Sequence, residues 1–133
     1  MVNLMKKKIM VVDDDSAVVL IVKSGIESID KDYEITTATS GKECLELLKN
    51  NNIPDLILLD IMMPEISGWE IYKKLKAHDM WRKIPVVFLT ARTDRAARDA
   101  GGFLGDDYIE KPFIIPELKD RIDKILEKNL NNQ

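Results

Sequence analysis

Three short apolar segments, each ending directly at a polar residue, constrain the fold of this chain more than any other feature. They are Ile9–Val12, Leu56–Leu59 and Val86–Leu89. Each is apolar at every position rather than alternating, which is typical of strands covered on both faces in a parallel sheet. The residues that follow them are Asp13, Asp60 and Thr90. Two weaker strand candidates are Glu34–Ala38 and Tyr108–Ile109.

Helical patterns separate these strands. The expected helices cover residues 16–29, 40–50, 68–79, 93–102 and 115–130. Asp15 or Ser16 can cap the first helix, and Ser40 with Glu43 three residues later forms a capping box for the second. Strand and helix therefore alternate along the whole chain. This order predicts an α/β fold in which right-handed crossovers place helices on both faces of a parallel sheet.

Length and charge exclude several classes of protein. The 133 residues suit a single domain over residues 1–133, with a core from about 8 to 128 and a polar tail at 129–133. The net charge of −3 gives no excess of positive charge for direct nucleic-acid binding. The single Cys44 excludes an internal disulfide, and Ile9–Val12 is too short for a signal peptide or a membrane span. We therefore expect a soluble cytoplasmic protein that does not contact membranes.

The polar residues that follow the strands form the candidate site. They are Asp13–Asp15, Asp60, Thr90 and Lys111. Because ligands of open α/β sheets bind outside the carboxyl ends of the strands, these residues are expected to converge on one edge. Clustered carboxylates raise one another's pKa unless a cation neutralises them, and oxygen ligands without His or Cys favour Mg²⁺ or Mn²⁺. With an ammonium and a hydroxyl added, the set describes a phosphoryl-transfer site.

Each of these residues also has an ordinary structural interpretation. Three aspartates after a strand are more often a solvated turn or a helix cap, Thr90 alone is a strand-end residue, and Lys111 alone is a surface lysine. His78 lies in a charged stretch and is expected to be solvated, while Trp69 and Trp81 are expected to be packing residues. The joint arrangement at one sheet edge is what favours the functional interpretation.

Four segments resemble, in order and spacing, the signature segments of the response-regulator receiver domain, the CheY-like family of two-component signalling. They read "IMVVDDDS", "LILLDIMMPEISGWE", "VVFLTA" and "DDYIEKPF". The resemblance extends from about Lys8 to about Leu126. It implies a flavodoxin-like, doubly wound domain whose five parallel strands have the order 2-1-3-4-5, with five helices on the two faces.

The same resemblance implies a role for each site residue. Asp60 is the phosphoacceptor, and Asp13 and Asp14 hold the metal ion, Asp14 directly and Asp13 largely through water. The backbone carbonyl of Met62 also contacts the metal. The backbone N–H of Ala91 and the side chain of Lys111 contact the phosphoryl group. Thr90 and Tyr108 are the switch residues. The peptide bond between Lys111 and Pro112 is expected to be cis.

The implied function is a phosphorylation-activated switch. A sensor histidine kinase or a histidine phosphotransfer protein donates a phosphoryl group to Asp60, and the aspartyl phosphate later hydrolyses. Phosphorylation changes the face built from the fourth helix, fifth strand and fifth helix, which regulates an unknown downstream protein. The chain acts as a monomer or a weak dimer through that face. It is not expected to be an enzyme beyond its own phosphorylation and dephosphorylation.

Two positions depart from the family pattern. The segment from Thr90 to Lys111 is about one residue shorter than usual, which bears on the fourth helix and on the coupling of Tyr108. Ser16 stands where a proline often follows the acidic residues, and a serine there can cap the first helix instead. Neither departure touches the residues that carry the phosphorylation chemistry.

Three alternative functions fit parts of the sequence. A haloacid-dehalogenase-like phosphatase would use Asp13 and Asp15, but it leaves Asp60 without a role and there is no room for its cap domain. A flavodoxin-type flavin domain would need a Ser/Thr/Gly-rich phosphate loop where three carboxylates stand. A phosphorylation-independent, receiver-like interaction module would not need the joint presence of the acidic residues, Thr90 and Lys111.

Overall fold

The computed structural model describes residues 6–91 and 107–131. In chain order the elements are β1 (Lys7–Val12), α1 (Ser16–Ile29), β2 (Tyr33–Ala38), α2 (Gly41–Lys49), β3 (Leu56–Asp60), α3 (Gly68–Lys76), β4 (Val86–Thr90), β5 (Asp107–Glu110) and α5 (Ile115–Asn131). The helix predicted over 93–102 lies outside the described residues. Among the helices that are described, none is both long and apolar enough to cross a membrane.

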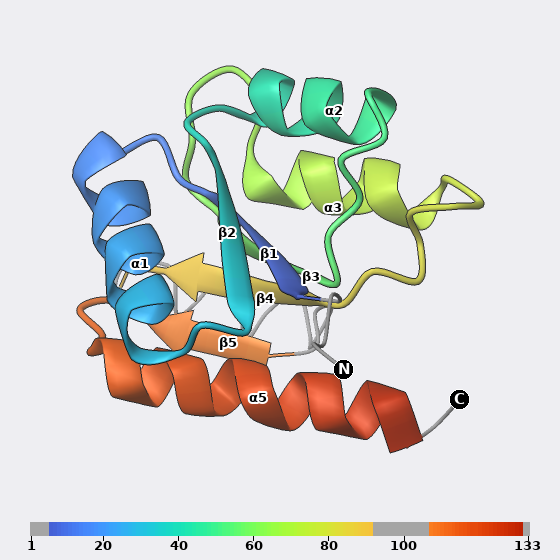
Figure 1. Ribbon diagram of the computed structural model, residues 1–133. Helices are drawn as coiled ribbons and strands as arrows, with labels where there is room; N and C mark the ends of the chain where they lie inside the picture. Colours follow the sequence, from blue (N-terminus) through green and yellow to red (C-terminus); the bar gives the residue numbers. More distant parts are fainter. Residues whose placement is uncertain (1–5, 92–106, 132–133) are drawn as a thin grey trace.

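The strands form one parallel sheet in the order β2-β1-β3-β4-β5, which confirms the flavodoxin-like order. Figure 1 shows α2 and α3 over one face of this sheet, with α1 and α5 on the other side. The α/β class and the doubly wound arrangement predicted from the sequence are therefore confirmed. Because every strand is parallel, all the carboxyl ends lie at one edge of the sheet, and all the amino ends lie at the other.

Alternate residues of each central strand face opposite helix layers. In β1, Met10 and Val12 pack in a buried cluster with α2 and α3, whereas Ile9 and Val11 pack in a second cluster with α1 and α5. All four side chains are fully buried. A strand covered on both faces needs an apolar residue at every position. This is why the apolar runs of the sequence are continuous rather than alternating.

Capping side chains decide where α1 and α2 begin. Asp15, rather than Ser16, caps α1 and accepts a backbone N–H of the first turn at 2.9 Å. Ser40 caps α2 and accepts the N–H of Glu43 at 3.1 Å. The Glu43 carboxylate, however, accepts the N–H of Thr39 at 2.6 Å instead of the N–H of Ser40. The complete capping box predicted for α2 is therefore wrong in its second half.

Helix α3 carries the complete capping box, formed by Ser67 and Glu70. The helix ends at Lys76 rather than at the predicted residue 79. The chain turns there because His78 Nδ1 accepts the backbone N–H groups of Met80 and Trp81, at 3.1 and 3.3 Å. A side chain that bonds to its own backbone in this way competes with helix continuation.

Candidate functional site

Four polar side chains lie at the carboxyl edge of the sheet. Asp60 and Thr90 are the last residues of β3 and β4, whereas Asp13 and Lys111 directly follow β1 and β5. Among the residues that the structure describes, Asp13, Asp60 and Thr90 are the buried polar ones, with exposed fractions of 0%, 4% and 2%. Buried polar groups need partners. This edge is therefore an assembled site rather than a solvated turn.

Three carboxylates gather within this site. One carboxylate oxygen from each of Asp13, Asp14 and Asp60 lies within 4.8 Å of the other two. Asp13 and Asp60 are buried, whereas Asp14 is exposed. An oxygen-only ligand set of this kind fits a hard divalent cation such as Mg²⁺ or Mn²⁺. The cluster could therefore hold a metal ion, with Asp14 on its solvent side.

Asp15, the third aspartate of the acidic stretch, is not one of these three. Its carboxylate caps α1, and its own N–H donates to Asp13 Oδ1 at 2.9 Å. The N–H of Asp13 in turn donates to the carbonyl of Ala38, the last residue of β2, at 3.1 Å. These bonds fix the loop between β1 and α1. The phosphatase alternative needs Asp13 and Asp15 together in the site, and the capping role of Asp15 argues against it.

Lys111 reaches the acidic cluster from the far end of the chain. Its Nζ lies 2.6 Å from Asp13 Oδ2 and 3.6 Å from Asp60 Oδ1. Its backbone is held at the end of β4, because the Lys111 N–H donates to the Thr90 carbonyl at 2.7 Å. The peptide bond between Lys111 and Pro112 is cis, as predicted. The ammonium is thus a counter-ion shared by two buried carboxylates, whereas a surface lysine would extend into solvent.

The electrostatics of the site follow from burial and crowding. The pKa of Asp60 is raised to about 7, first by burial and then by the charge of Asp13. A hydrogen bond to Asp14 and the charge of Asp14 raise it further, whereas the charge of Lys111 lowers it. For Lys111, burial disfavours the charged form. The hydrogen bond to Asp13 and the charges of both carboxylates outweigh it, so the pKa of the ammonium is raised. One lysine therefore does not neutralise the cluster, and an added cation would be bound favourably.

The two predicted backbone contacts flank the strand ends. Met62 lies two residues after Asp60, and its side chain is 65% exposed, so a role for this residue would rest on its backbone alone. Ala91 directly follows Thr90 and is partly buried. Both residues lie in the loops at the carboxyl edge of the sheet, which is the position implied by the resemblance to the receiver family.

Tyr108 lies in β5, where it pairs with Phe88 of β4. Its side chain is 6% exposed and stacks on Phe88, with ring centroids 5.3 Å apart and an interplanar angle of 23°. The Trp69 ring is 6.3 Å from Tyr108 and 4.6 Å from Phe88. The tyrosine therefore points into the α3 side of the core. The aromatic rings connect β5 and β4 to the first turn of α3.

Gly68 is a site residue that was not predicted from the sequence. It is the first residue of α3, and its N–H donates to the Ile61 carbonyl at 2.8 Å. A Cβ at this position would lie 2.3 Å from the carbonyl oxygen of Asp60. Only glycine lets the helix start this close to the end of β3. The signal in the sequence is a glycine that begins a helical pattern shortly after a strand-end aspartate.

Comparison with known proteins identifies proteins that are similar in sequence to this chain. The family model described as the response regulator receiver domain matches residues 9–123. The chain is 43% identical over 119 residues to response regulator SaeR of Staphylococcus epidermidis, which covers 89% of this chain and 49% of that protein. It is 39% identical over 127 residues to the probable transcriptional regulator ycf27 of Cyanophora paradoxa, which covers 95% of this chain and 51% of that protein. The chain thus spans about half the length of these curated relatives.

Solved structures show the same fold. A CheY-like response regulator receiver domain protein from Methanospirillum hungatei superimposes with a TM-score of 0.79 at 32% identity, covering 93% of this chain and 97% of that one. The N-terminal domain of a response regulator receiver protein from Methanoculleus marisnigri gives a TM-score of 0.67 at 40% identity, covering 90% of this chain and 95% of that one. Both likenesses extend over nearly the whole chain.

Proposed function

This chain belongs to the response regulator receiver domain family of two-component signalling, and we propose that Asp60 is the residue on which it accepts a phosphoryl group. The observation that carries the proposal is the position of Asp60. It is the last residue of β3, it is buried, and it lies beside both the acidic pair and the Lys111 ammonium. A nucleophile held between an acidic cluster and a lysine is what phosphoryl transfer requires.

The chemical step begins with Asp60 in its ionised form. A carboxylate oxygen attacks the phosphorus of a phosphohistidine, the P–N bond breaks, and the imidazole of the donor leaves as the acyl phosphate forms. Lys111 would move its ammonium from Asp60 onto a phosphoryl oxygen, while it stays hydrogen-bonded to Asp13. The Ala91 N–H would donate to a second phosphoryl oxygen. Water later attacks the phosphorus, which releases phosphate and restores the Asp60 carboxylate.

Asp13, Asp14, Asp60 and the backbone carbonyl of Met62 would hold a Mg²⁺ or Mn²⁺ ion, which when bound neutralises charge on the phosphoryl oxygens. The raised pKa of Asp60 supports this assignment, because a carboxyl near half-protonation at neutral pH ionises more completely once a cation stabilises its charge. Asp13 would then be held jointly by Lys111 and by the ion, directly or through water.

The switch would use Thr90 and Tyr108. Thr90 ends β4 beside Asp60, and its hydroxyl would donate to the phosphoryl group. Tyr108 lies in the neighbouring strand β5, and its ring packs on Phe88, which is in β4 like Thr90. A movement of Thr90 is thus transmitted along β4 to the tyrosine and to the face that includes β5 and α5. Phosphorylation would shift the population of two arrangements of that face.

The partners follow from the family and belong to this proposal. Response regulators receive phosphoryl groups from sensor kinases and act on downstream targets. Here the donor would be a sensor histidine kinase or a histidine phosphotransfer protein in the cytoplasm, and the target would recognise the β5–α5 face of a single domain over residues 1–133, as a monomer or a weak dimer. The family is not a classical enzyme family. We therefore assign catalysis only of self-phosphorylation and dephosphorylation.

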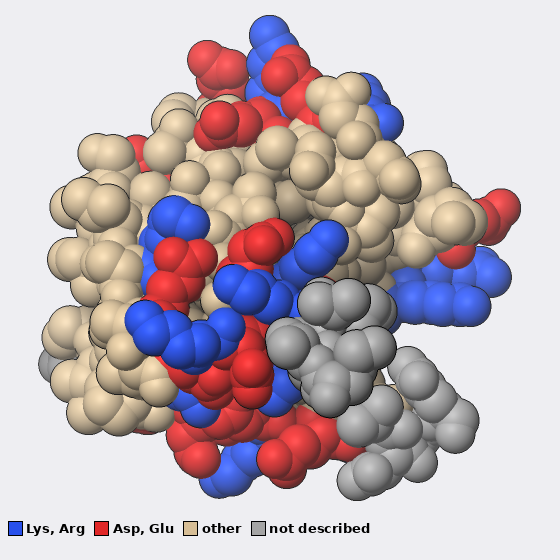
Figure 2. All heavy atoms as spheres, viewed as in Figure 1, with Lys and Arg blue, Asp and Glu red and all other residues tan. Residues whose placement is uncertain are grey.

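Direct nucleic-acid binding is not part of the proposed role of this domain. Figure 2 shows acidic and basic side chains mixed along α5. Lys119 pairs with Asp123 at 2.8 Å, and Lys124 pairs with Asp120 at 3.0 Å. Positive charge on this helix is therefore neutralised locally instead of forming a basic stripe. Such alternating charges are suited to selective contact with another protein.

One experiment tests the proposed chemistry. The protein is incubated with Mg²⁺ and acetyl phosphate, and its intact mass is measured. Wild type is expected to gain one phosphoryl group, Asp60→Asn none, and Asp15→Ala one, because Asp15 caps α1 instead of entering the cluster. A wild-type mass that never changes contradicts the proposal. Retention of the added mass by Asp60→Asn would move the acceptor to another residue.

A further inference from the structure

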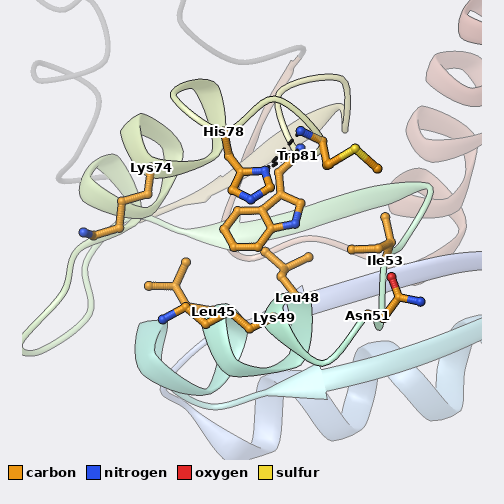
Figure 3. Close-up of a pocket in the computed structure, with 9 residues that line it drawn as sticks. Leu45, Leu48, Lys49, Asn51, Ile53, Lys74, His78 and Trp81 are labelled. Carbon is orange, nitrogen blue, oxygen red and sulfur yellow. Dashed lines mark hydrogen bonds between the residues drawn. The ribbon is translucent and has the colours of Figure 1, made fainter.

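A second recessed surface lies at the opposite edge of the sheet, near the amino ends of the strands. A groove of about 590 Å³ separates the end of α2 from the turn that follows α3. Figure 3 shows Leu45 and Leu48 of α2 on one side and the stacked rings of His78 and Trp81 on the other. The groove is apolar at its centre and open to solvent. Grooves of this volume are typical of binding sites.

The wall of this groove is fixed rather than loose. His78 stacks on Trp81 with ring centroids 3.7 Å apart and an interplanar angle of 7°. Its Nδ1 accepts the N–H groups of Met80 and Trp81. The imidazole is thus partly buried and structural, and the prediction that it is simply solvated is wrong. The turn holds Met80 outward with 74% of the residue exposed. A methionine kept in water by a structured turn is a common feature of adaptable binding surfaces.

The groove continues into a second one. A depression of about 490 Å³ lies under the amino ends of the strands, and it shares Ile53 and Met80 with the first. These two exposed apolar residues form a ridge, with one depression on either side. We call the two depressions and this ridge the paired grooves. An elongated surface with two recesses suits a chain segment that carries two apolar anchors better than it suits a compact small molecule.

Positive charge surrounds the paired grooves. Their lining includes Lys49 and Lys74 in the first groove and Lys6, Lys7 and Lys83 in the second. The one acidic residue of the lining is Asp55, whose Oδ2 already accepts the N–H of Lys8 at 2.8 Å. The chain as a whole carries a net charge of −3. The lysines are therefore a local concentration of charge that differs in sign from the rest of the protein.

The two lysines of the first groove are available to a ligand. Neither Lys49 nor Lys74 forms an ion pair within 4 Å with any residue that the structure describes. Both are exposed and lie at the edge of an apolar depression. Carboxylates placed there would gain charge-assisted contacts without displacing an ion pair to any of residues 6–91 and 107–131.

We propose that the paired grooves bind an acidic amphipathic segment of a partner protein, with apolar side chains seated on both sides of the Ile53–Met80 ridge and carboxylates at Lys49, Lys74 and Lys83. Apolar burial supplies affinity, and the lysines supply selectivity for acidic segments. This surface is separate from the phosphorylation site, because β3 alone places about 16 Å between the two edges of the sheet. It gives the domain a docking site of its own, beyond the switch.

The test uses a defined probe. A synthetic amphipathic peptide with leucine and phenylalanine on one helix face and glutamate on the other is titrated into the ¹⁵N-labelled full chain. A second peptide has the same apolar face and lysine in place of glutamate. We expect saturable amide shifts at residues 45–53 and 74–83 with the acidic peptide only. Raising the salt concentration should weaken this binding, because exposed charges contribute to it.

Variants assign the binding to this surface. Met80→Ser removes an exposed side chain and leaves the core intact, while Lys49→Glu with Lys74→Glu reverses the rim charge; each is expected to weaken binding by at least about tenfold. The matched controls are Leu20→Ser, an exposed leucine on α1, and Lys42→Glu, an exposed lysine on α2, and neither should change it. Equal binding of both peptides, amide shifts confined to α1 or to the carboxyl edge of the sheet, self-association without peptide binding, or unchanged affinity in the groove variants would each overturn the proposal.

Discussion

The ammonium of Lys111 lies closer to Asp13 than to Asp60: 2.6 Å separates Nζ from Asp13 Oδ2, and 3.6 Å separates it from Asp60 Oδ1. The lysine therefore compensates the deeper carboxylate first. Asp13 is fully buried, and within the described part of the chain its carboxylate accepts from this ammonium and from the backbone N–H of Asp15. The ammonium compensates the negative charge of Asp60 only in part. Of the two carboxylates, Asp60 is therefore the one that a further cation would stabilise more.

Removing the ammonium should destabilise the fold. Lys111→Met leaves Asp13 buried without its ion pair, and we expect a loss of unfolding free energy on the order of 3 kcal/mol in metal-free buffer. Urea denaturation measures it. The control is Lys124→Met, which breaks an exposed pair with Asp120 and should cost less than about 1 kcal/mol. Equal effects of the two changes would mean that Lys111 is not a structural counter-ion.

The raised pKa of Asp60 predicts how stability depends on pH. The folded protein holds a proton on Asp60 up to about pH 7, whereas the unfolded chain releases it near the ordinary value of 3.8. Unfolding is therefore favoured increasingly as the pH rises between these values, by at most about 4 kcal/mol from this group. Asp60→Asn lacks this penalty. Its stability relative to wild type, from urea midpoints in EDTA, should be greater at pH 8 than at pH 5.

The same stability difference between wild type and Asp60→Asn, measured with Mg²⁺ added, tests whether Asp60 helps to bind a metal ion. If Asp60 helps to hold the ion, Mg²⁺ should reduce the gap between wild type and Asp60→Asn at pH 8, because the cation stabilises the ionised carboxylate. A gap that is the same in EDTA and in Mg²⁺ would count against a metal site at this cluster. A gap that does not change between pH 5 and pH 8 would count against the raised pKa of Asp60.

Gly68 should tolerate no side chain. In Gly68→Ala the new Cβ would meet the Asp60 carbonyl oxygen at 2.3 Å, so either α3 or the end of β3 must move. We expect a loss of about 1–3 kcal/mol, despite the better helix propensity of alanine, together with slower phosphorylation by acetyl phosphate. Gly41→Ala is the matched control at the start of α2. Its Cβ would meet only side-chain atoms, at 3.0 Å or more, and its phosphorylation rate should stay near that of wild type.

Trp69 should report the switch. Its ring lies 4.6 Å from Phe88 and 6.3 Å from Tyr108, centroid to centroid, so a change in the packing of Tyr108 alters its surroundings. Beryllofluoride with Mg²⁺, a mimic of the phosphoryl group, is expected to change the tryptophan emission of wild type and of Trp81→Phe. The change should be absent in Trp69→Phe. A signal that disappears with Trp81 instead would place the rearrangement at the other edge of the sheet.

Most of the fold could be predicted from the sequence because the apolar runs carry the information. The continuous apolar runs that include Ile9, Leu56 and Val86 are buried strands, as predicted, because a strand covered on both faces cannot alternate. The division of the acidic stretch, with Asp15 as a helix cap, was also predictable from capping chemistry. The convergence of Asp13, Asp60 and Lys111 then follows from the parallel topology, whereas the strand order was implied by the resemblance to the receiver family.

Other features depend on contacts that no local pattern encodes. The requirement for glycine at Gly68 arises from the carbonyl of a residue in another element, and the partly buried state of His78 arises from its stacking on Trp81. The Glu43 carboxylate accepts the N–H of Thr39, the residue before the helix cap Ser40, instead of completing the predicted capping box. These are consequences of packing geometry, which spacing in the sequence does not specify.

The central claim is that Asp60 accepts the phosphoryl group, and chemical mapping of the acyl phosphate tests it most directly. The protein is phosphorylated with acetyl phosphate and Mg²⁺, reduced with borohydride and digested, and the peptides are sequenced by tandem mass spectrometry. Reduction converts a phosphorylated aspartate to homoserine. Homoserine at position 60 is the predicted result, with Asp13, Asp14 and Asp15 unchanged. Homoserine at Asp13, or at no aspartate of the chain, would contradict the account.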